Sequence, residues 1–178
     1  MSQPDNRRRP RPAIEIADDL LERTGEAMQA GDFGSFRQHF AMPYVLETFD
    51  GMRLLQTRDE LRTVFEAVHA FRVANGIVGA MRENVSAEYI DDTTIGATHV
   101  SQLMKRDDAL FGRSYPSYSI IKYDGEAWRI QYCQYALQDL DQLNTALTVP
   151  QRKTPRNCAA LSELSGRGLR IPGLRTSS

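Results

Sequence analysis

Cysteine is scarce in this sequence of 178 residues. The two cysteines, Cys133 and Cys158, lie in neither a CxxC motif nor another metal-binding spacing. Two thiols are too few for a disulfide framework, so the sequence predicts a location in the reducing cytoplasm. We expect no export signal, because the arginines at 7–9 precede a proline-broken, acidic segment where a signal peptide needs an apolar one.

Long apolar runs and the short motifs of cofactor-binding proteins are also missing. No run approaches the roughly 18 apolar residues that a membrane-spanning helix requires. The three histidines, His39, His69 and His99, form no HxH, HxxxH or HExxH spacing, so we expect no histidine-based metal site. No P-loop, dinucleotide fingerprint or nucleophile elbow occurs, and we therefore expect no cofactor.

Aromatic residues are absent from two basic terminal segments. Residues 1–12 carry a net charge of +3 and residues 150–178 one of +5, which leaves −9 on residues 13–149 because the total is −1. Such segments either bind nucleic acid or a membrane surface, or they stay solvated or fold back onto the acidic body. Without an aromatic side chain to stack on bases, we favour the second interpretation and expect neither nucleic acid nor a membrane as a partner.

Helical patterns dominate the first part of the chain. Residues 13–30 repeat apolar positions at helical spacing and end before Gly31, which suits a left-handed C-cap. Asp32 is placed to cap a short second helix, DFGSFRQHF. The segment Thr57–Glu60 matches a capping box, in which threonine and glutamate satisfy each other's free backbone N–H groups. The sequence therefore predicts three helices before residue 76.

Strand patterns dominate the rest. YVLETF and MRLLQ flank an Asp50-Gly51 turn, and residues 77–137 alternate with period two. Short turns divide this region into four strands at about 79–90, 94–106, 113–123 and 127–137, which predicts an antiparallel meander. The fold class is thus α+β: a cone in which three N-terminal helices pack in a strongly curved, mostly antiparallel sheet with a pocket at the open end.

The expected domain organisation has three parts. Residues 1–12 form a basic disordered N-terminal arm, and residues 13–137 form a single cone-shaped α+β domain. Residues 138–178 contain a short helix, LQDLDQLNTAL, and a basic C-terminal tail whose prolines and glycines predict no regular structure.

This order of elements resembles the nuclear transport factor 2-like superfamily, and within it the polyketide-cyclase-like (SnoaL-like) branch. The resemblance rests on Gly31-Asp32, the strand from Pro43 to Phe49, the capped helix from Thr57 and the strand pair YSIIKYDGEAWRI, and it covers residues 13–137. It implies a cone with a hydrophobic pocket and a homodimer formed through the outer sheet face. It implies no single activity, because the superfamily contains isomerases, dehydratases, epoxide hydrolases and cyclases beside binding and scaffold members.

Glu47 is the candidate general base, because isomerase-type members of the superfamily place a carboxylate on this strand. It shares a face with Val45 and Phe49, while Tyr44, Leu46 and Thr48 take the other face. If the Val45 face is the inner one, desolvation raises the pKa of Glu47 and makes it a usable base. If Leu46 faces inward, Glu47 is a solvated strand residue. The pattern leaves both registers open.

His99, in the strand IGATHVSQLM, is the candidate proton shuttle, since its small neighbours leave room for a ligand. The alternative is a histidine satisfied by a neighbouring hydroxyl in a core or a dimer face. On the last strand, Trp128, Ile130, Tyr132 and Gln134 share a face that we take as the inner one, with Tyr132 as an orienting donor. The candidate ligand-binding residues are Tyr44, Tyr118, Trp128, Tyr132 and Gln134, although tyrosines on sheets more often pack or contact another subunit.

Half of an isomerase-like acid/base set is missing. The first helix has no tyrosine, and the final strands offer no Asp or Glu on the expected inner face for an oxyanion hole. We therefore expect a protein that binds a small apolar organic molecule. Cofactor-free isomerisation, dehydration or cyclisation is one interpretation, and a non-catalytic dimerisation or ligand-sensing module is the alternative.

Overall fold

The computed structural model describes residues 11–148. Six strands form one sheet in the order β2-β1-β6-β5-β4-β3. All neighbouring pairs are antiparallel except β1 and β6, which run parallel. The strands are β1 (Phe40–Thr48), β2 (Gly51–Leu55), β3 (Ile77–Asp91), β4 (Thr94–Lys105), β5 (Leu110–Tyr123) and β6 (Trp128–Tyr135). The predicted strand pair and four-stranded meander are thereby confirmed.

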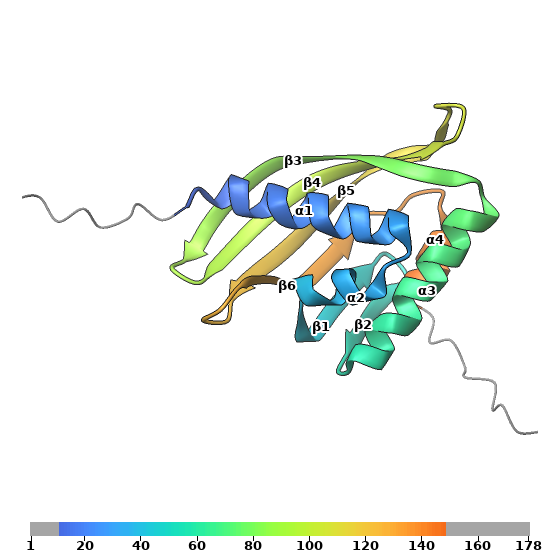
Figure 1. The fold of residues 1–178 in the computed structure, drawn as a ribbon. Coiled ribbons are helices and arrows are strands. Elements are labelled where there is room, and N and C mark those ends of the chain that lie inside the picture. The colour runs from blue at the N-terminus through green and yellow to red at the C-terminus, as the bar shows by residue number, and fades with distance from the viewer. Residues whose placement is uncertain (1–10, 149–178) are drawn as a thin grey trace, which may run out of the picture.

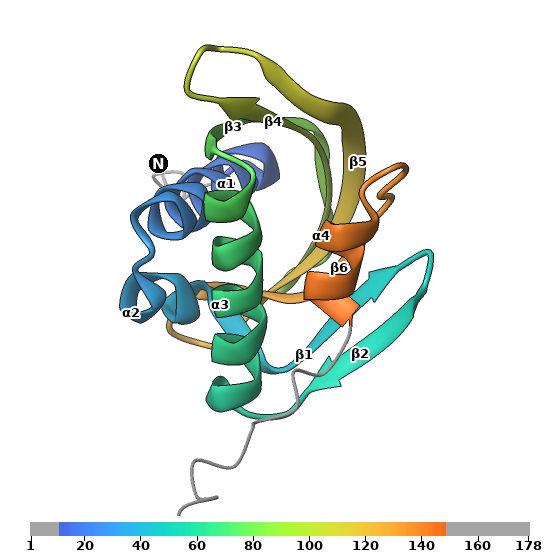
Figure 2. The same ribbon diagram turned by 90° about the vertical axis from the view of Figure 1, so that its right-hand side faces the viewer.

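Within residues 11–148, four α-helices accompany the sheet, and Figures 1 and 2 show α1 and α3 on its concave side. The helices are α1 (Ala13–Ala30), α2 (Phe33–Phe36), α3 (Arg58–Ala74) and α4 (Asp141–Thr148), with a short 3-10 turn, η1 (Arg37–His39), after α2. Figure 2 shows the sheet curving around α1 and α3. The predicted fold class, α+β with helices packed in a curved and mostly antiparallel sheet, is confirmed.

Local chemistry explains the helix ends. Gly31 has a φ of 69° and closes α1 in the left-handed conformation that glycine adopts without a Cβ clash. At the start of α3 both hydrogen bonds of the predicted capping box are present between Thr57 and Glu60. No helix within residues 11–148 is both long and apolar enough to cross a bilayer.

The terminal predictions have different outcomes. The helix expected after residue 138 forms as α4, and its buried Leu143 and Leu147 join the main hydrophobic core. The folded body therefore includes α4, which the sequence pattern grouped with the tail. Apart from Arg11 and Pro12, the basic segments at 1–12 and 150–178 lie outside the described residues, as does Cys158.

The sheet has two unlike faces. On β1 the alternation buries Tyr44, Leu46 and Thr48 and leaves Val45 and Glu47 more accessible. The concave face therefore carries Leu46 rather than Glu47. This decides between the two registers that the sequence left open, in favour of Leu46 facing inward.

A bulge changes the face on which side chains of β6 lie. Ile121 of β5 pairs with Ile130, but the preceding residue, Ile120, pairs with Tyr132, so Gln131 is an extra residue in β6. Such a bulge shifts the alternation by one position. Beyond it Cys133 becomes the buried residue, 3% exposed, and Tyr132 and Gln134 lie on the convex face.

Candidate functional site

A cavity of about 610 Å³ lies between the helices and the concave face of the sheet. Its size falls within the range of roughly 300–1,000 Å³ that small-molecule pockets occupy. The four α-helices and the strands all contribute to its wall, whose aromatic and aliphatic side chains include Leu20, Phe36, Phe40, Leu46, Phe65, Phe71, Leu103 and Leu143. The helices position this wall because the apolar stripe of α3 faces the core.

Two arginines bring positive charge to this wall. Arg72 comes from the last turn of α3 and is 8% exposed, and Arg82 comes from β3. One nitrogen of Arg82, Nη1, donates to the Leu21 carbonyl oxygen at 2.8 Å and to Thr24 Oγ1 at 3.2 Å. Burial, partly offset by Tyr115, lowers the pKa of Arg72, and the neighbouring positive charge of Arg82 lowers it further. A guanidinium nevertheless stays protonated in proteins, so both cations persist.

His99 lies at the cavity wall on β4 and is 4% exposed. Its Nε2 has no hydrogen-bond partner among the described residues. Burial, together with the positive charge of Arg82, lowers the pKa of His99 to about 3. The ring is therefore neutral near pH 7, where it can accept or donate a hydrogen bond but is a weak base.

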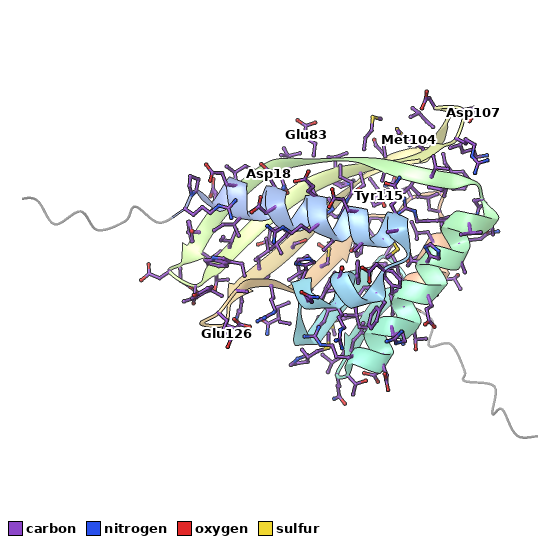
Figure 3. All side chains as sticks on the ribbon, viewed as in Figure 1. Asp18, Glu83, Met104, Asp107, Tyr115 and Glu126 are labelled. Atoms are coloured by element: carbon purple, nitrogen blue, oxygen red, sulfur yellow. The ribbon has the colours of Figure 1, made fainter. Side chains whose placement is uncertain are left out.

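Hydroxyl and thiol groups complete the polar part of the cavity. Tyr115 is hydrogen-bonded to Ser101, its cross-strand partner on β4. Tyr44, Cys133 and Tyr135 form a buried cluster in which burial raises the pKa of each group, so all three are protonated near neutral pH. Figure 3 labels Tyr115 on the side of the sheet that α1 covers, while Glu83 of β3 points away from the helix.

Glu47 belongs to a separate polar group on the convex face. Tyr132 Oη donates to Glu47 Oε2 at 2.5 Å, and Gln134 Nε2 donates to Glu47 Oε1 at 3.4 Å. Burial and the hydrogen bond to Glu47 raise the pKa of Tyr132 to about 12, so Tyr132 remains a donor. We refer to Glu47, Tyr132 and Gln134 as the outer cluster. None of the three lines the cavity.

The structure thus divides the predicted site residues into three places. Tyr44 and His99 line the cavity, whereas the outer cluster lies on the other side of the sheet. Tyr118 pairs with Gln134 across β5 and β6 and is 37% exposed, so it shares the convex face. Trp128 packs against Tyr89 and Tyr123 and against a smaller hydrophobic cluster that Ile16 and Leu20 of α1 form with Ile95 and Ile121 of the sheet.

The expectation that Trp128, Ile130, Tyr132 and Gln134 share the inner face is therefore wrong beyond Ile130. The physical reason is the extra residue at Gln131, which reverses the alternation for the rest of β6. The structure does not bring the two candidate catalytic residues together, because Glu47 lies on the convex face and His99 lines the cavity. Glu47 and His99 therefore do not share the single site in which a catalytic base and a proton shuttle would act together.

Sequence reasoning missed Arg72, Arg82, Ser101 and Tyr115. One signal for Arg72 was present, because it follows Val68 by four residues and so continues the apolar stripe of α3. A charged residue on such a stripe points to a buried polar function. Among residues 11–148 no group of three or more His, Cys, Asp or Glu side chains is arranged to hold a metal ion.

Comparison with known proteins identifies the fold. No family model matches the chain, and no curated protein matches it. An NTF2-like protein of unknown function from Shewanella oneidensis MR-1 aligns with 13% identity and a TM-score of 0.55, over 69% of this chain and 98% of that one. An NTF2-like protein with a cystatin-like fold from Novosphingobium aromaticivorans has 16% identity and a TM-score of 0.57, over 71% and 82% of the two chains.

A third similar structure is Aln2 from a Streptomyces species, with 15% identity, a TM-score of 0.57 and coverage of 74% of this chain and 96% of that one. The chain therefore has the nuclear transport factor 2-like fold that its sequence resembles. At these sequence identities the similarity establishes the fold only, and the function has to be inferred from the residues of the site.

Proposed function

We propose that this protein binds a small organic molecule with a largely apolar body in the cavity on the concave side of the sheet. One observation carries the proposal: His99 is among the residues that line an apolar cavity of about 610 Å³, and its buried Nε2 has no hydrogen-bond partner among the described residues. Buried polar atoms are normally hydrogen-bonded, and an unpaired one on a residue that lines a cavity suits a site for a ligand.

Binding without turnover is favoured over proton-transfer catalysis. The candidate base Glu47 and the donor Tyr132 bond to each other on the convex face, whereas His99 lines the cavity. A pKa of about 3 makes His99 a poor proton acceptor near pH 7. The non-catalytic interpretation of the sequence, a ligand-binding or ligand-sensing module, therefore agrees better with the site than an isomerase, dehydratase or cyclase.

The proposal is tested with the neutral probe 2-naphthamide and calorimetric titration. Ala80 lines the cavity, and the larger side chain of Ala80→Leu occupies part of it, so we expect weaker binding by this variant. Ala70→Leu, on an exposed position of α3, is the matched control and is expected to bind as the parent does. Equal binding by both variants, or a parent protein that binds neither this probe nor its anionic analogues, would contradict the proposal.

Turnover is examined in the same mixtures. The probe is recovered after prolonged incubation and compared by mass spectrometry with probe kept in buffer. Unchanged probe agrees with a binding module. A product that depends on the protein and is lost in Ala80→Leu would instead assign an enzymatic activity to the cavity.

We also propose that the protein forms a homodimer through the convex face of the sheet. Met52 and Leu54 of β2 pair with Glu47 and Val45, so they share this face, and they are 70% and 49% exposed. Exposed apolar side chains on one sheet face suit a self-complementary interface. Sedimentation measurements over a range of concentrations test this, and Leu54→Lys is expected to shift the equilibrium to the monomer.

The remaining expectations concern location and partners. The cytoplasmic location predicted from the cysteine content stays a prediction. The expectation that the basic segments bind neither nucleic acid nor membranes also stays one. It is tested by comparing the salt-dependent retention of DNA by the full chain with that by a chain lacking residues 1–10 and 149–178. Equal retention, or none, is the expected result.

A further inference from the structure

Arg72 carries a buried charge that no carboxylate of the described residues neutralises. It is 8% exposed, and within residues 11–148 it forms neither an ion pair nor a hydrogen bond. The two groups that act on its pKa electrostatically are Tyr115 and another cation, Arg82, and neither is a carboxylate. Buried charges are normally paired, because an unpaired one loses its hydration without compensation.

The end of α3 does not supply the missing partner. Arg72 lies in the last turn of the helix, where the dipole favours a cation only weakly. Two carbonyl oxygens of that turn already have backbone donors: Phe71 accepts from Asn75 and Val73 accepts from Gly76. The position at the helix end therefore does not account for the buried charge.

Arg82 places a second cation at the same wall of the cavity. Its contacts with Leu21 and Thr24 use one nitrogen, Nη1, and these hydrogen bonds fix the guanidinium against α1. The two arginines are close enough for each to repel the other electrostatically. Two like charges held together in one cavity form a site for an anion.

Neutral donors lie around this pair. Ser101 is the cross-strand neighbour of both Arg82 and Tyr115, and His99 lies two residues away on the same face of β4. The carboxylates among the lining residues, Asp18, Glu22 and Glu26, belong to α1, and all three are exposed. The positive charges of the lining are therefore buried or half-buried, whereas its negative charges are exposed.

We propose that the molecule bound in the cavity is an organic anion, whose acidic head group contacts Arg72 and Arg82 and whose apolar body packs on the aromatic wall. This inference rests on the proposed function, because it specifies the class of ligand for the same cavity. A carboxylate and a phosphate monoester share the required chemistry, a planar or tetrahedral oxyanion that accepts hydrogen bonds from guanidinium groups.

The test compares three probes that share one aromatic body: 2-naphthoate, 2-naphthyl phosphate and the neutral 2-naphthamide. Titration calorimetry at low salt is expected to give at least one anion an affinity roughly tenfold or more above that of the amide, the usual size of a charge-assisted contact. Whichever anion binds more tightly identifies the head group. Equal affinity of all three probes overturns the inference.

The variant Arg72→Met tests whether Arg72 causes the preference for an anionic probe. This variant is expected to lose the preference for the anion and to keep its affinity for the amide, which also shows that it is folded. Arg62→Met is the matched control, because Arg62 lies on the same helix but over the Phe33 ring at the surface. An unchanged anion preference in Arg72→Met contradicts the inference.

The two proposals fail in different ways. If no probe binds, the cavity is not a ligand site and the proposed function itself fails. If 2-naphthamide binds and is excluded by Ala80→Leu, but the anions gain nothing from Arg72, only the inference about charge fails.

Discussion

Polar groups on the two faces of the sheet are organised in opposite ways. On the convex face, Tyr132 and Gln134 both donate to Glu47, and the outer cluster is complete without any other molecule. On the concave face, His99 Nε2 is buried without a hydrogen-bond partner among the described residues, and the buried residue Arg72 forms no ion pair with them. The two groups are separated only by the thickness of one sheet.

This difference separates a structural polar group from a candidate binding site. A polar group whose members satisfy one another stabilises the fold and needs no ligand, as in the outer cluster. Groups buried without partners lower stability, and they are retained most readily where a ligand compensates them. The sequence made Glu47 the candidate base, yet the unpartnered groups of the cavity are the better candidates for function.

The largest expected effect comes from removing the unpaired charge. Arg72→Met is predicted to raise the free energy of unfolding in the absence of ligand by about 2 kcal/mol, because an uncompensated buried ion is replaced by an apolar chain. Urea unfolding measures the change, and Arg62→Met serves as the exposed control. A decrease for Arg72→Met would mean that Arg72 has a stabilising partner and would remove the contrast between the two faces.

The pH dependence of stability tests the environment of His99. Its pKa is about 3 in the folded protein and about 6.5 when unfolded, so below pH 6.5 the unfolded state binds the extra proton. The stability that depends on neutral His99 is complete above pH 6.5 and falls as the pH drops toward 3. Between pH 7 and pH 5 we expect this histidine to account for a loss of up to about 2 kcal/mol.

The comparison for this prediction is His99→Gln, which cannot titrate. Urea unfolding at pH 7 and pH 5 is expected to show a smaller pH-dependent loss in this variant than in the parent. The other histidines are present in both proteins and cancel in the difference. Equal losses would show that His99 is not held neutral by burial.

The outer cluster is tested with Tyr132→Phe. This change removes the hydroxyl that donates to Glu47 and is expected to lower the free energy of unfolding by about 1 kcal/mol, the usual net value of a hydrogen bond. Affinity of the cavity for 2-naphthamide is expected to stay unchanged. Weaker probe binding with unaltered stability would connect the outer cluster to the cavity and contradict their separation.

The smallest effect is expected for Glu47→Gln. The amide oxygen still accepts from Tyr132, so the free energy of unfolding is expected to fall by no more than about 0.5 kcal/mol, the difference between a charge-assisted bond and a neutral one in a partly exposed place. Probe binding and recovery of unchanged probe are measured alongside. Loss of a protein-dependent product in this variant alone would restore Glu47 as a catalytic base.

Much of the architecture could be predicted from the sequence. The capping box at Thr57, the C-cap at Gly31 and the period-two alternation after Gly76 are local signals, and each has the predicted structure. The order of the elements was enough to predict a curved sheet with the helices packed in it. These features depend on neighbours along the chain, which is why the sequence contains them.

The site could be predicted only in part. His99 and Tyr44 line the cavity as expected, but the faces assigned to Tyr132 and Gln134 were reversed by one extra residue, Gln131. Nothing in the residue pattern marks this bulge, because it arises from pairing with β5. The approach of Arg72 and Arg82 also depends on how α3 packs against β3. Both elements contribute to the cavity together with α1, which is distant from them in the sequence.

By itself, the sequence determined the kinds of elements, their order and their ends, because helix caps, turns and hydrophobic periodicity act over a few residues. Only the tertiary structure decided which polar groups satisfy each other and which face a cavity unpaired. That outcome depends on strand register and on contacts between segments far apart in the chain, where a shift of one residue moves a side chain from one face of the sheet to the other.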